Sequence, residues 1–310
     1  MGKVGVAVRG ARVVQPLWDL KSIVAELRTS REVTHSVRHL GRVRELPSRE
    51  VISEVVDRLR AALFPTHYGG SDLSDESIDY FVGETLNTGL TMLAEQLRRG
   101  LHFDGLPAPG SETDLARKAA EMARDFAAQL PAIRALIVSD LHAAYQGDPA
   151  ASSISEVLLC YPGTAAIVLY RFAHALHELG ARLIARLISE IAHMRTGVDI
   201  HPGAKIGASF FIDHGTGVVI GETTIVGERV RLYQAVTLGA KRFPVGEDGK
   251  LIKGVPRHPI VEDDVVIYAG ATILGRITIG RGSTIGGNVW LTHNVEPGSN
   301  LSQAQMRSAD

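Results

Sequence analysis

The sequence is poor in cysteine: Cys160 is the only one among 310 residues. A single cysteine allows neither an internal disulfide nor a multi-cysteine metal site, and this composition fits a reducing compartment. We therefore expect a cytoplasmic protein. Because Cys160 lies in the apolar segment "SEVLLCYPG", we expect it to be a buried small hydrophobic residue and not a nucleophile.

An excess of one charge and long apolar runs are also absent. The formal net charge is −1, from 33 Lys and Arg against 34 Asp and Glu, so nothing in the composition favours nucleic acid or an anionic membrane as a partner. No segment approaches the roughly 18 apolar residues of a membrane span. The start, "MGKVGVAVRG", lacks a secretory apolar region and carries Val6 where a myristoylation signal requires Ser or Thr. We expect neither export nor membrane anchoring.

The sequence does contain two halves with different periodicities. Residues 48–196 place apolar side chains three and four positions apart among strong helix formers, as in "EVISEVVDRLRAALF" and "VLYRFAHALHELGARLIARLISEIAHM". This pattern predicts an α-helical domain. Residues 1–47 are rich in Val, Arg and Ser without a clear period, and they receive no assignment.

After residue 197 the period changes to six. The recurring aliphatic residues are Ile200, Ile206, Ile212, Ile220, Val226, Leu232, Leu238, Val261, Ile267, Ile273, Ile279, Ile285 and Leu291. A hexapeptide repeat with one inward aliphatic residue indicates a parallel β-helix, whose coils pair at about 4.8 Å. We predict this solenoid over residues 197–297, because the alternative β-sandwich would show a period of two.

The repeat is interrupted twice. Ile212 and Ile220 are eight residues apart instead of six, so the "DHGTG" corner is two residues longer than its neighbours. Residues 240–258 leave the repeat as a loop rich in Pro, Gly and charge, and residues 298–310 follow the last repeat as a tail. Because insertions in a solenoid form surface loops that often bind ligands, we look for the site at these two interruptions.

Polar residues gather at the start of the repeat and at its interruptions: Asp199 and His201, then Asp213 and His214, then Arg257 and His258. Three repeats make about one turn, so Asp199 and His214 should return to the same side one coil apart. A carboxylate that holds one nitrogen of a histidine leaves the other as a general base for a hydroxyl group. The alternatives are a hydrogen-bonded turn histidine and an aspartate that merely forms the turn before Pro202.

Two other kinds of site fit the sequence poorly. His201, His214, His258 and His293 have no short paired spacing and no cysteine companion, so we predict no metal site. The glycines of "HGTGVVIG" miss the phosphate-loop spacing and lie outside any βαβ unit, so we predict no phosphate loop.

Two long runs resemble the serine O-acetyltransferases: "TGVDIHPGAKIGASFFIDHGTGVVIGETTIVGERVRLYQAVTLGAK" and "RHPIVEDDVVIYAGATILGRITIGRGSTIGG". The resemblance is close over residues 148–289 and looser before them. It implies a helical N-terminal domain followed by a left-handed parallel β-helix. It also implies acetyl transfer from acetyl-CoA to the hydroxyl of L-serine, giving O-acetyl-L-serine for cysteine biosynthesis, in a ternary complex without a covalent intermediate.

The resemblance also implies roles for individual residues. His214 would be the general base and Asp199 its orienting carboxylate. Asp148 and Asp213 match positions that hold serine through its ammonium group, and Arg257 and His258 match positions that contact the serine carboxylate and the reacting centre. Ala269 and Gly287 match backbone positions that line an acetyl-CoA groove between neighbouring β-helices.

The charges of these residues suit a zwitterionic acceptor. Serine needs carboxylates for its amine and a cation for its carboxylate, which Asp148, Asp213 and Arg257 would supply. Attack on the thioester creates an oxyanion that either His258 or backbone N–H groups would stabilise. The sequence does not choose between these two donors.

The resemblance extends to partners. It implies a homotrimer or a dimer of trimers, and L-cysteine as a feedback inhibitor at the serine site. Contacts of the 240–257 loop with CoA do not transfer, because this loop differs from the Gly-rich stretch of many relatives. Relatives that bind O-acetylserine sulfhydrylase end in isoleucine, whereas this chain ends in Asp310, so we do not expect a stable complex with that enzyme.

Three alternative functions use the same fold. The chain would be an acetyltransferase for a sugar or another hydroxylated acceptor if Asp148 and Arg257 were only surface charges. It would be a rigid trimeric scaffold if replacing His214 changed no activity. A zinc enzyme similar to γ-carbonic anhydrase would require bound metal.

Overall fold

The computed structural model describes residues 18–30, 46–70, 73–102 and 112–303. The chain divides into two compact units, Met1–Glu45 and Leu46–Asp310. The first unit, for which the sequence pattern predicts no structure, contains a helix, α1 (Leu20–Thr29). It begins after Asp19, whose carboxylate accepts hydrogen bonds from the backbone N–H groups of Lys21 and Ser22, and none of its residues is buried.

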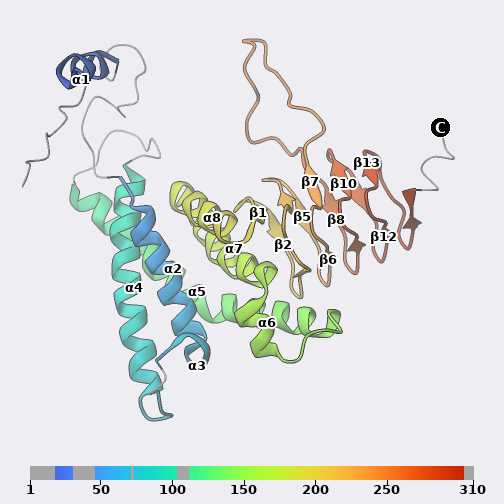
Figure 1. The fold of residues 1–310 in the computed structure, drawn as a ribbon, viewed down its shortest axis with the longest axis horizontal. Helices are drawn as coiled ribbons and strands as arrows, with labels where there is room; N and C mark the ends of the chain where they lie inside the picture. The colour runs from blue at the N-terminus through green and yellow to red at the C-terminus, as the bar shows by residue number, and fades with distance from the viewer. Residues whose placement is uncertain (1–17, 31–45, 71–72, 103–111, 304–310) are drawn as a thin grey trace, which may run out of the picture. The chain divides into compact units, whose positions relative to one another are not determined.

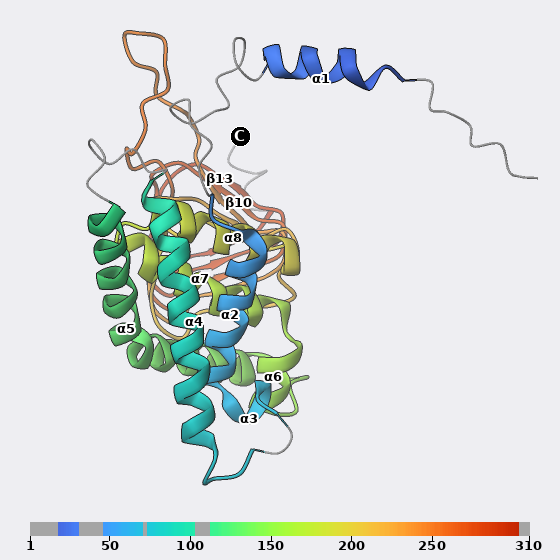
Figure 2. The same cartoon turned by 90° about the vertical axis from the view of Figure 1, so that its left-hand side faces the viewer.

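The second unit begins with helices, as the three- and four-residue periodicity predicts. They are α2 (Arg49–Leu63), α3 (Pro65–Tyr68), α4 (Ile78–Leu101), α5 (Glu112–Gly147), α6 (Ile154–Cys160), α7 (Pro162–Glu178) and α8 (Arg182–Thr196). Helix α4 packs against both α2 and α5, and α7 packs against α8 (Figures 1 and 2). Ser48 caps the start of α2 with its side-chain oxygen. Gly197 ends α8 in the left-handed conformation, where a residue without Cβ fits best.

Short parallel strands follow in three sheets, which we name A, B and C (Figure 1). Sheet A contains β1 (Asp199–Ile200), β4 (Val219–Ile220), β7 (Thr237–Gly239), β10 (Thr272–Leu274) and β13 (Trp290–Leu291). Sheet B contains β2 (Lys205–Ile206), β5 (Ile225–Val226), β8 (Ile260–Val261) and β11 (Thr278–Ile279). Sheet C contains β3 (Phe211–Ile212), β6 (Arg231–Leu232), β9 (Val266–Ile267), β12 (Thr284–Ile285) and β14 (Asn300–Leu301). The chain visits the sheets in the order A, B, C and so forms the predicted left-handed parallel β-helix.

The aliphatic residues of the six-residue repeat fill the interior of the coils. Every one of them is buried, with 8% or less of its surface exposed. They stack in register: Ile220 pairs with Ile200 in the coil before and with Leu238 in the coil after. Burying one such side chain stabilises the fold by about 1.5–3 kcal/mol, so the repeat itself supplies the solenoid core.

A buried ion pair joins the helices to the first coil. Arg171 of α7 and Asp140 of α5 are bonded at 3.0 Å, and both side chains are 3% exposed. The guanidinium also donates to the carbonyls of Ile206 and Gly207, each at 2.6 Å. Asp140 accepts from the backbone N–H of Phe210 at 2.8 Å. These contacts hold α5 and α7 on the first coil.

The expectation that Cys160 is buried is wrong. It is exposed at the last position of α6. This short helix turns Val157 and Leu158 inward, so the apolar segment "SEVLLCYPG" does not bury all of its members.

The chain between β7 and β8 leaves the coils as a long loop (Figures 1 and 2). Val245 and Leu251 form an antiparallel bridge within it. Both side chains are exposed, as are those of Phe243 and Ile252. The loop therefore carries apolar side chains that nothing in this chain covers among the described residues.

No helix among those described is by itself both long enough and apolar enough to cross a bilayer. Helices α6 and α7 pass that test only as a pair, and the pair is bent by 76° where the two helices meet.

Candidate active site

The expanded "DHGTG" corner lies between β3 of sheet C and β4 of sheet A. Its backbone turns through left-handed conformations at His214 (φ 59°), Gly215 (φ 90°) and Gly217 (φ 78°). The start of α7 packs against this corner, where a Cβ on Gly163 would lie 2.1 Å from the carbonyl oxygen of Ile212. Glycine is therefore required at position 163 for the helix to approach so closely.

The two polar side chains of this corner point into different environments. Asp213 is buried, whereas 71% of the His214 side chain is exposed. His214 Nδ1 lies 3.8 Å from Asp213 Oδ1. The imidazole therefore faces outward, where a substrate has access to it.

Asp148 joins the same corner from the loop after α5. Its Oδ2 accepts a hydrogen bond from the Tyr161 hydroxyl at 2.5 Å, and its Oδ1 accepts one from the Ala150 N–H at 2.8 Å. The bond from Tyr161, followed by that from Ala150, lowers the pKa of Asp148, and the charges of Arg231 and then His214 lower it further. The same bond raises the pKa of Tyr161 to about 12. Asp148 is thus held as an oriented carboxylate.

Asp213 already has a cationic partner in this chain. Arg231 of β6 donates to Asp213 Oδ2 at 2.9 Å and to the carbonyl oxygen of Gly147 at 2.6 Å. Gly147 directly precedes Asp148. Asp148, Asp213 and His214 therefore form one cluster, which Arg231 and Tyr161 support.

The register of Asp199 differs from the expected one. Asp199 pairs with Val219, twenty residues later, because the expanded corner lengthens this coil. The next coil, from Val219 to Thr237, contains eighteen residues. In the described part of the chain no hydrogen bond or ion pair joins Asp199 to His214, whose nearest carboxylate partner is Asp213. The role of Asp199 as orienting carboxylate remains a prediction.

Arg257 and His258 lie at a different edge of the solenoid, between sheets A and B. Arg257 donates to Glu222 Oε2 at 2.6 Å. The backbone N–H groups of both residues donate to the hydroxyl oxygen of Thr223, at 2.9 and 3.1 Å. A Cβ on Gly221 would lie 2.1 Å from the His258 ring. Thr223 and Gly221 therefore fix where the loop re-enters the coils.

The hydrogen bonds of His258 assign its tautomer. Its Nδ1 accepts from the Thr223 N–H at 3.1 Å and lies 2.9 Å from the Thr223 hydroxyl. The proton of the neutral ring is therefore on Nε2. Burial lowers the pKa of His258 to about 4, so at neutral pH this ring is an uncharged hydrogen-bond donor.

A half-buried histidine, His201, also lies at this edge. His201 accepts from the Gly203 N–H at Nδ1 at 3.0 Å, and its ring meets that of His177 edge-on with centroids 6.0 Å apart. Burial lowers the pKa of His201 to about 4. This histidine is a structural part of the first coil.

These two histidines predict a pH dependence of stability. Their pKa is about 6.5 when unfolded and about 4 when folded, so between these values the unfolded chain binds more protons. The free energy of unfolding should therefore fall as the pH falls through this window. Thermal unfolding at about pH 7 and about pH 5 measures the effect. The variant His201→Gln should show a smaller difference in unfolding temperature between the two pH values. An unchanged difference would contradict the contribution of His201 to this pH dependence.

Ala269 and Gly287 lie on the same edge as His214. Each is between a sheet C strand and the following sheet A strand, in coils further along the solenoid. A Cβ at Gly287 would lie 3.2 Å from the Ala269 carbonyl oxygen. The two positions therefore lie in contact in neighbouring coils, and their role in binding acetyl-CoA remains a prediction.

The structure thus brings the predicted residues together at two edges and not at one. Asp148, Asp213 and His214 are on the edge between sheets C and A, and Arg257 and His258 are on the edge between A and B. Sequence reasoning missed the supporting residues Tyr161, Glu222, Thr223 and Arg231. The repeat marks Arg231 only as an outward position, and no pattern in the sequence signals its partners.

No group of three or more His, Cys, Asp or Glu residues is placed to hold a metal ion in the ranges that the structure describes.

The stacked coils and their six-residue repeat define a protein of the hexapeptide-repeat class. The family described as bacterial transferase hexapeptide (six repeats) matches residues 258–293. The plasmid serine acetyltransferase of Synechococcus elongatus is 56% identical over 94% of this chain and 92% of its own length. The chain therefore belongs to the serine acetyltransferase family and is an acyltransferase.

Solved structures agree with this assignment. Serine acetyltransferase 1 of Entamoeba histolytica in complex with L-cysteine has a TM-score of 0.70 and 34% identity, covering 91% of this chain and 97% of that chain. The serine acetyltransferase of Neisseria gonorrhoeae in complex with serine has a TM-score of 0.53 and 27% identity, covering 85% and 97%.

Proposed function

We propose that this enzyme transfers the acetyl group of acetyl-CoA to the hydroxyl of L-serine, releasing O-acetyl-L-serine and CoA. The observation that carries the proposal is the exposed imidazole of His214 beside the oriented carboxylate of Asp148. A base next to an anion suits an acceptor that carries both a hydroxyl and an ammonium group. Relatives named for this reaction match almost the whole chain.

The chemical steps need the residues of the two edges together with Asp199 of β1. His214 removes the hydroxyl proton while the serine oxygen attacks the thioester carbonyl, and Asp199 orients the imidazole. The tetrahedral oxyanion collapses and expels the CoA thiolate, which takes the proton from His214. Acetyl-CoA supplies the acetyl group and lies along the groove of Ala269 and Gly287. No covalent enzyme intermediate forms.

The charges assign the remaining contacts. Asp148, together with Asp213, binds the serine ammonium, and Arg257 binds its carboxylate. His258 donates its Nε2 proton to the oxyanion, because its Nδ1 accepts from Thr223 and the ring is neutral. L-Cysteine carries the same ammonium and carboxylate groups as serine, so we propose that it competes at this site. The complex of the Entamoeba histolytica relative with L-cysteine supports this proposal.

Because the two sets of site residues lie on different edges of one chain, a complete site requires more than one copy of the chain. Arg257 and His258 reach His214 only if the A–B edge of one copy packs against the C–A edge of the next. Such a head-to-tail contact generates a ring. We propose a homotrimer, alone or in a dimer of trimers, with three shared sites and a cytoplasmic location. The prediction about O-acetylserine sulfhydrylase depends on Asp310, which lies outside the described residues.

The activity is tested by the release of free thiol from acetyl-CoA with and without L-serine. Serine-dependent release by the purified enzyme is the expected result. Absence of serine-dependent release would contradict the proposal, and other hydroxylated acceptors would then be tested.

Mixing two inactive variants tests the shared site. His214→Ala and His258→Ala damage opposite sides of it, so an equal mixture of chains in one trimer should regain about a quarter of wild-type activity. Co-expression followed by the thiol assay measures the recovery. The matched control mixes His214→Ala with Asp148→Ala, which damage the same side and should regain nothing. Equal results for both mixtures would argue that each site belongs to one chain.

A further inference from the structure

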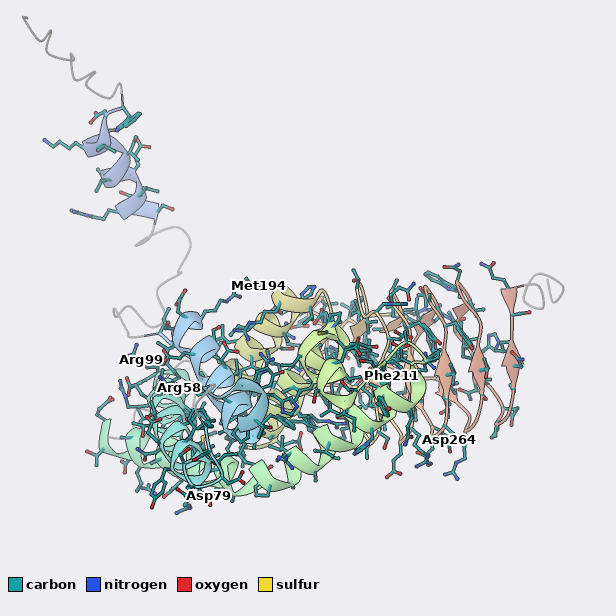
Figure 3. All side chains as sticks on the ribbon, turned by 60° about the horizontal axis from the view of Figure 1, so that its bottom comes forward. Arg58, Asp79, Arg99, Met194, Phe211 and Asp264 are labelled. Carbon is teal, nitrogen blue, oxygen red and sulfur yellow. The ribbon has the colours of Figure 1, made fainter. Side chains whose placement is uncertain are left out.

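Arg231 occupies an unusual position for an outward-facing residue of a solenoid strand. Its guanidinium lies 5.0 Å from the centre of the Phe211 ring and 4.6 Å from the centre of the Tyr233 ring. Tyr233 in turn stacks on Tyr268, with centroids 4.9 Å apart and planes at 14°. Figure 3 shows Phe211 where the helices meet the coils. Stacking on aromatic faces holds the planar cation in one place.

From this place the guanidinium joins two chain segments that each carry a carboxylate. One N–H group reaches Asp213 at 2.9 Å and another reaches the Gly147 carbonyl at 2.6 Å. Asp148 follows Gly147 directly, and the charge of Arg231 contributes to lowering its pKa. Arg231 thus connects the loop after α5 to the expanded corner.

The charge of Arg231 also decides what the corner attracts. Asp148 and Asp213 together would present two negative charges to an acceptor with one ammonium group and one carboxylate. Two free carboxylates repel each other and also repel the carboxylate of the acceptor. With Asp213 neutralised by Arg231, one negative charge remains on Asp148 and matches one ammonium group.

We propose that Arg231 is a positioning residue for the amino-acid acceptor: it neutralises Asp213 and fixes the Asp148 loop, so that Asp148 is the principal ligand of the ammonium group. This inference rests on the proposed function. It gives Asp148 a larger part in binding the ammonium group than Asp213, whereas the sequence treats the two aspartates as equivalent.

Steady-state kinetics of Arg231→Met test the proposal. Loss of a charge-assisted hydrogen bond should raise KM for L-serine roughly 10- to 100-fold. We expect KM for acetyl-CoA and kcat to stay within about twofold of wild type, because the donor groove and His214 are untouched. Arg231→Lys keeps the charge but loses the planar fork, so its KM for serine should lie between those of Arg231→Met and wild type.

Arg229→Met is the matched control. Arg229 lies two residues away on the same side of the solenoid and pairs with Asp264, which Figure 3 labels on the outer surface of the coils. Its removal should leave both KM values unchanged, and melting temperatures of all variants report on folding.

Two results would overturn the role of Arg231. One is an unchanged KM for serine in Arg231→Met. The other is a parallel loss of kcat and of both affinities with a lowered melting temperature in both Arg231 variants, which would make the residue merely structural. If the wild type itself shows no serine-dependent thiol release, the proposed function falls instead, so the two failures are distinguishable.

Discussion

Replacing His214 with alanine should lower serine-dependent acetyl transfer by roughly 10²–10⁴-fold, the usual contribution of a general base. The serine hydroxyl is a poor nucleophile until its proton is removed, and within the described residues His214 is the exposed imidazole beside Asp148 and Asp213. The loss should appear in kcat and leave KM for both substrates close to wild type, because the ring acts in the transition state. Thiol release from acetyl-CoA at saturating serine measures it.

The matched control is His293→Ala, which removes an exposed histidine of the same solenoid just after β13. It should retain wild-type activity. If His214→Ala retained activity as well, the base would lie elsewhere, and His258 would be the next residue to replace.

Arg171→Ala should lower the free energy of unfolding by about 3–5 kcal/mol, because it leaves the Asp140 carboxylate buried without its partner. The substitution also removes the donors to the carbonyls of Ile206 and Gly207. The expected consequence is a loosened contact between α7 and the first coil. Denaturant titration of wild type and variant measures the difference.

Arg195→Ala provides the comparison for this pair. Arg195 and Asp57 also form an ion pair, at 2.8 Å, but their side chains are 34% and 48% exposed. The loss of stability should therefore be below about 1 kcal/mol. Equal losses in the two variants would show that burial does not set the strength of the Arg171 contact.

The fold followed closely from the sequence because one rule governs the whole solenoid. Each coil buries one aliphatic residue per side, so Ile220 and Leu238 fill equivalent core positions one turn apart. The period of six in the sequence therefore marks these core positions directly. The expanded corner was visible for the same reason, since two extra residues disturb an otherwise regular count.

The details of the site were less accessible, because they depend on contacts between distant segments. Tyr161 lies after α6 but bonds to Asp148, which lies before that helix. Thr223 contacts His258 only where the long loop rejoins the coils. No repeat or fixed spacing in the sequence predicts either contact. Cys160 was misjudged for a related reason: an apolar neighbourhood in sequence does not say which face of a short helix packs inward.

The first coil differs from all later ones because α7 and α8 cover it through contacts such as Tyr170 to the carbonyl of Ala204. A stack of repeats unravels most easily from an uncovered end, where a coil has a neighbour on one side only. The expanded corner belongs to the covered coil, whereas Ala269 and Gly287 belong to coils nearer the open end. Under the proposed function, gain or loss of coils during evolution would change how much of the acetyl-CoA the edge contacts, while His214 stays at the helical end of the solenoid.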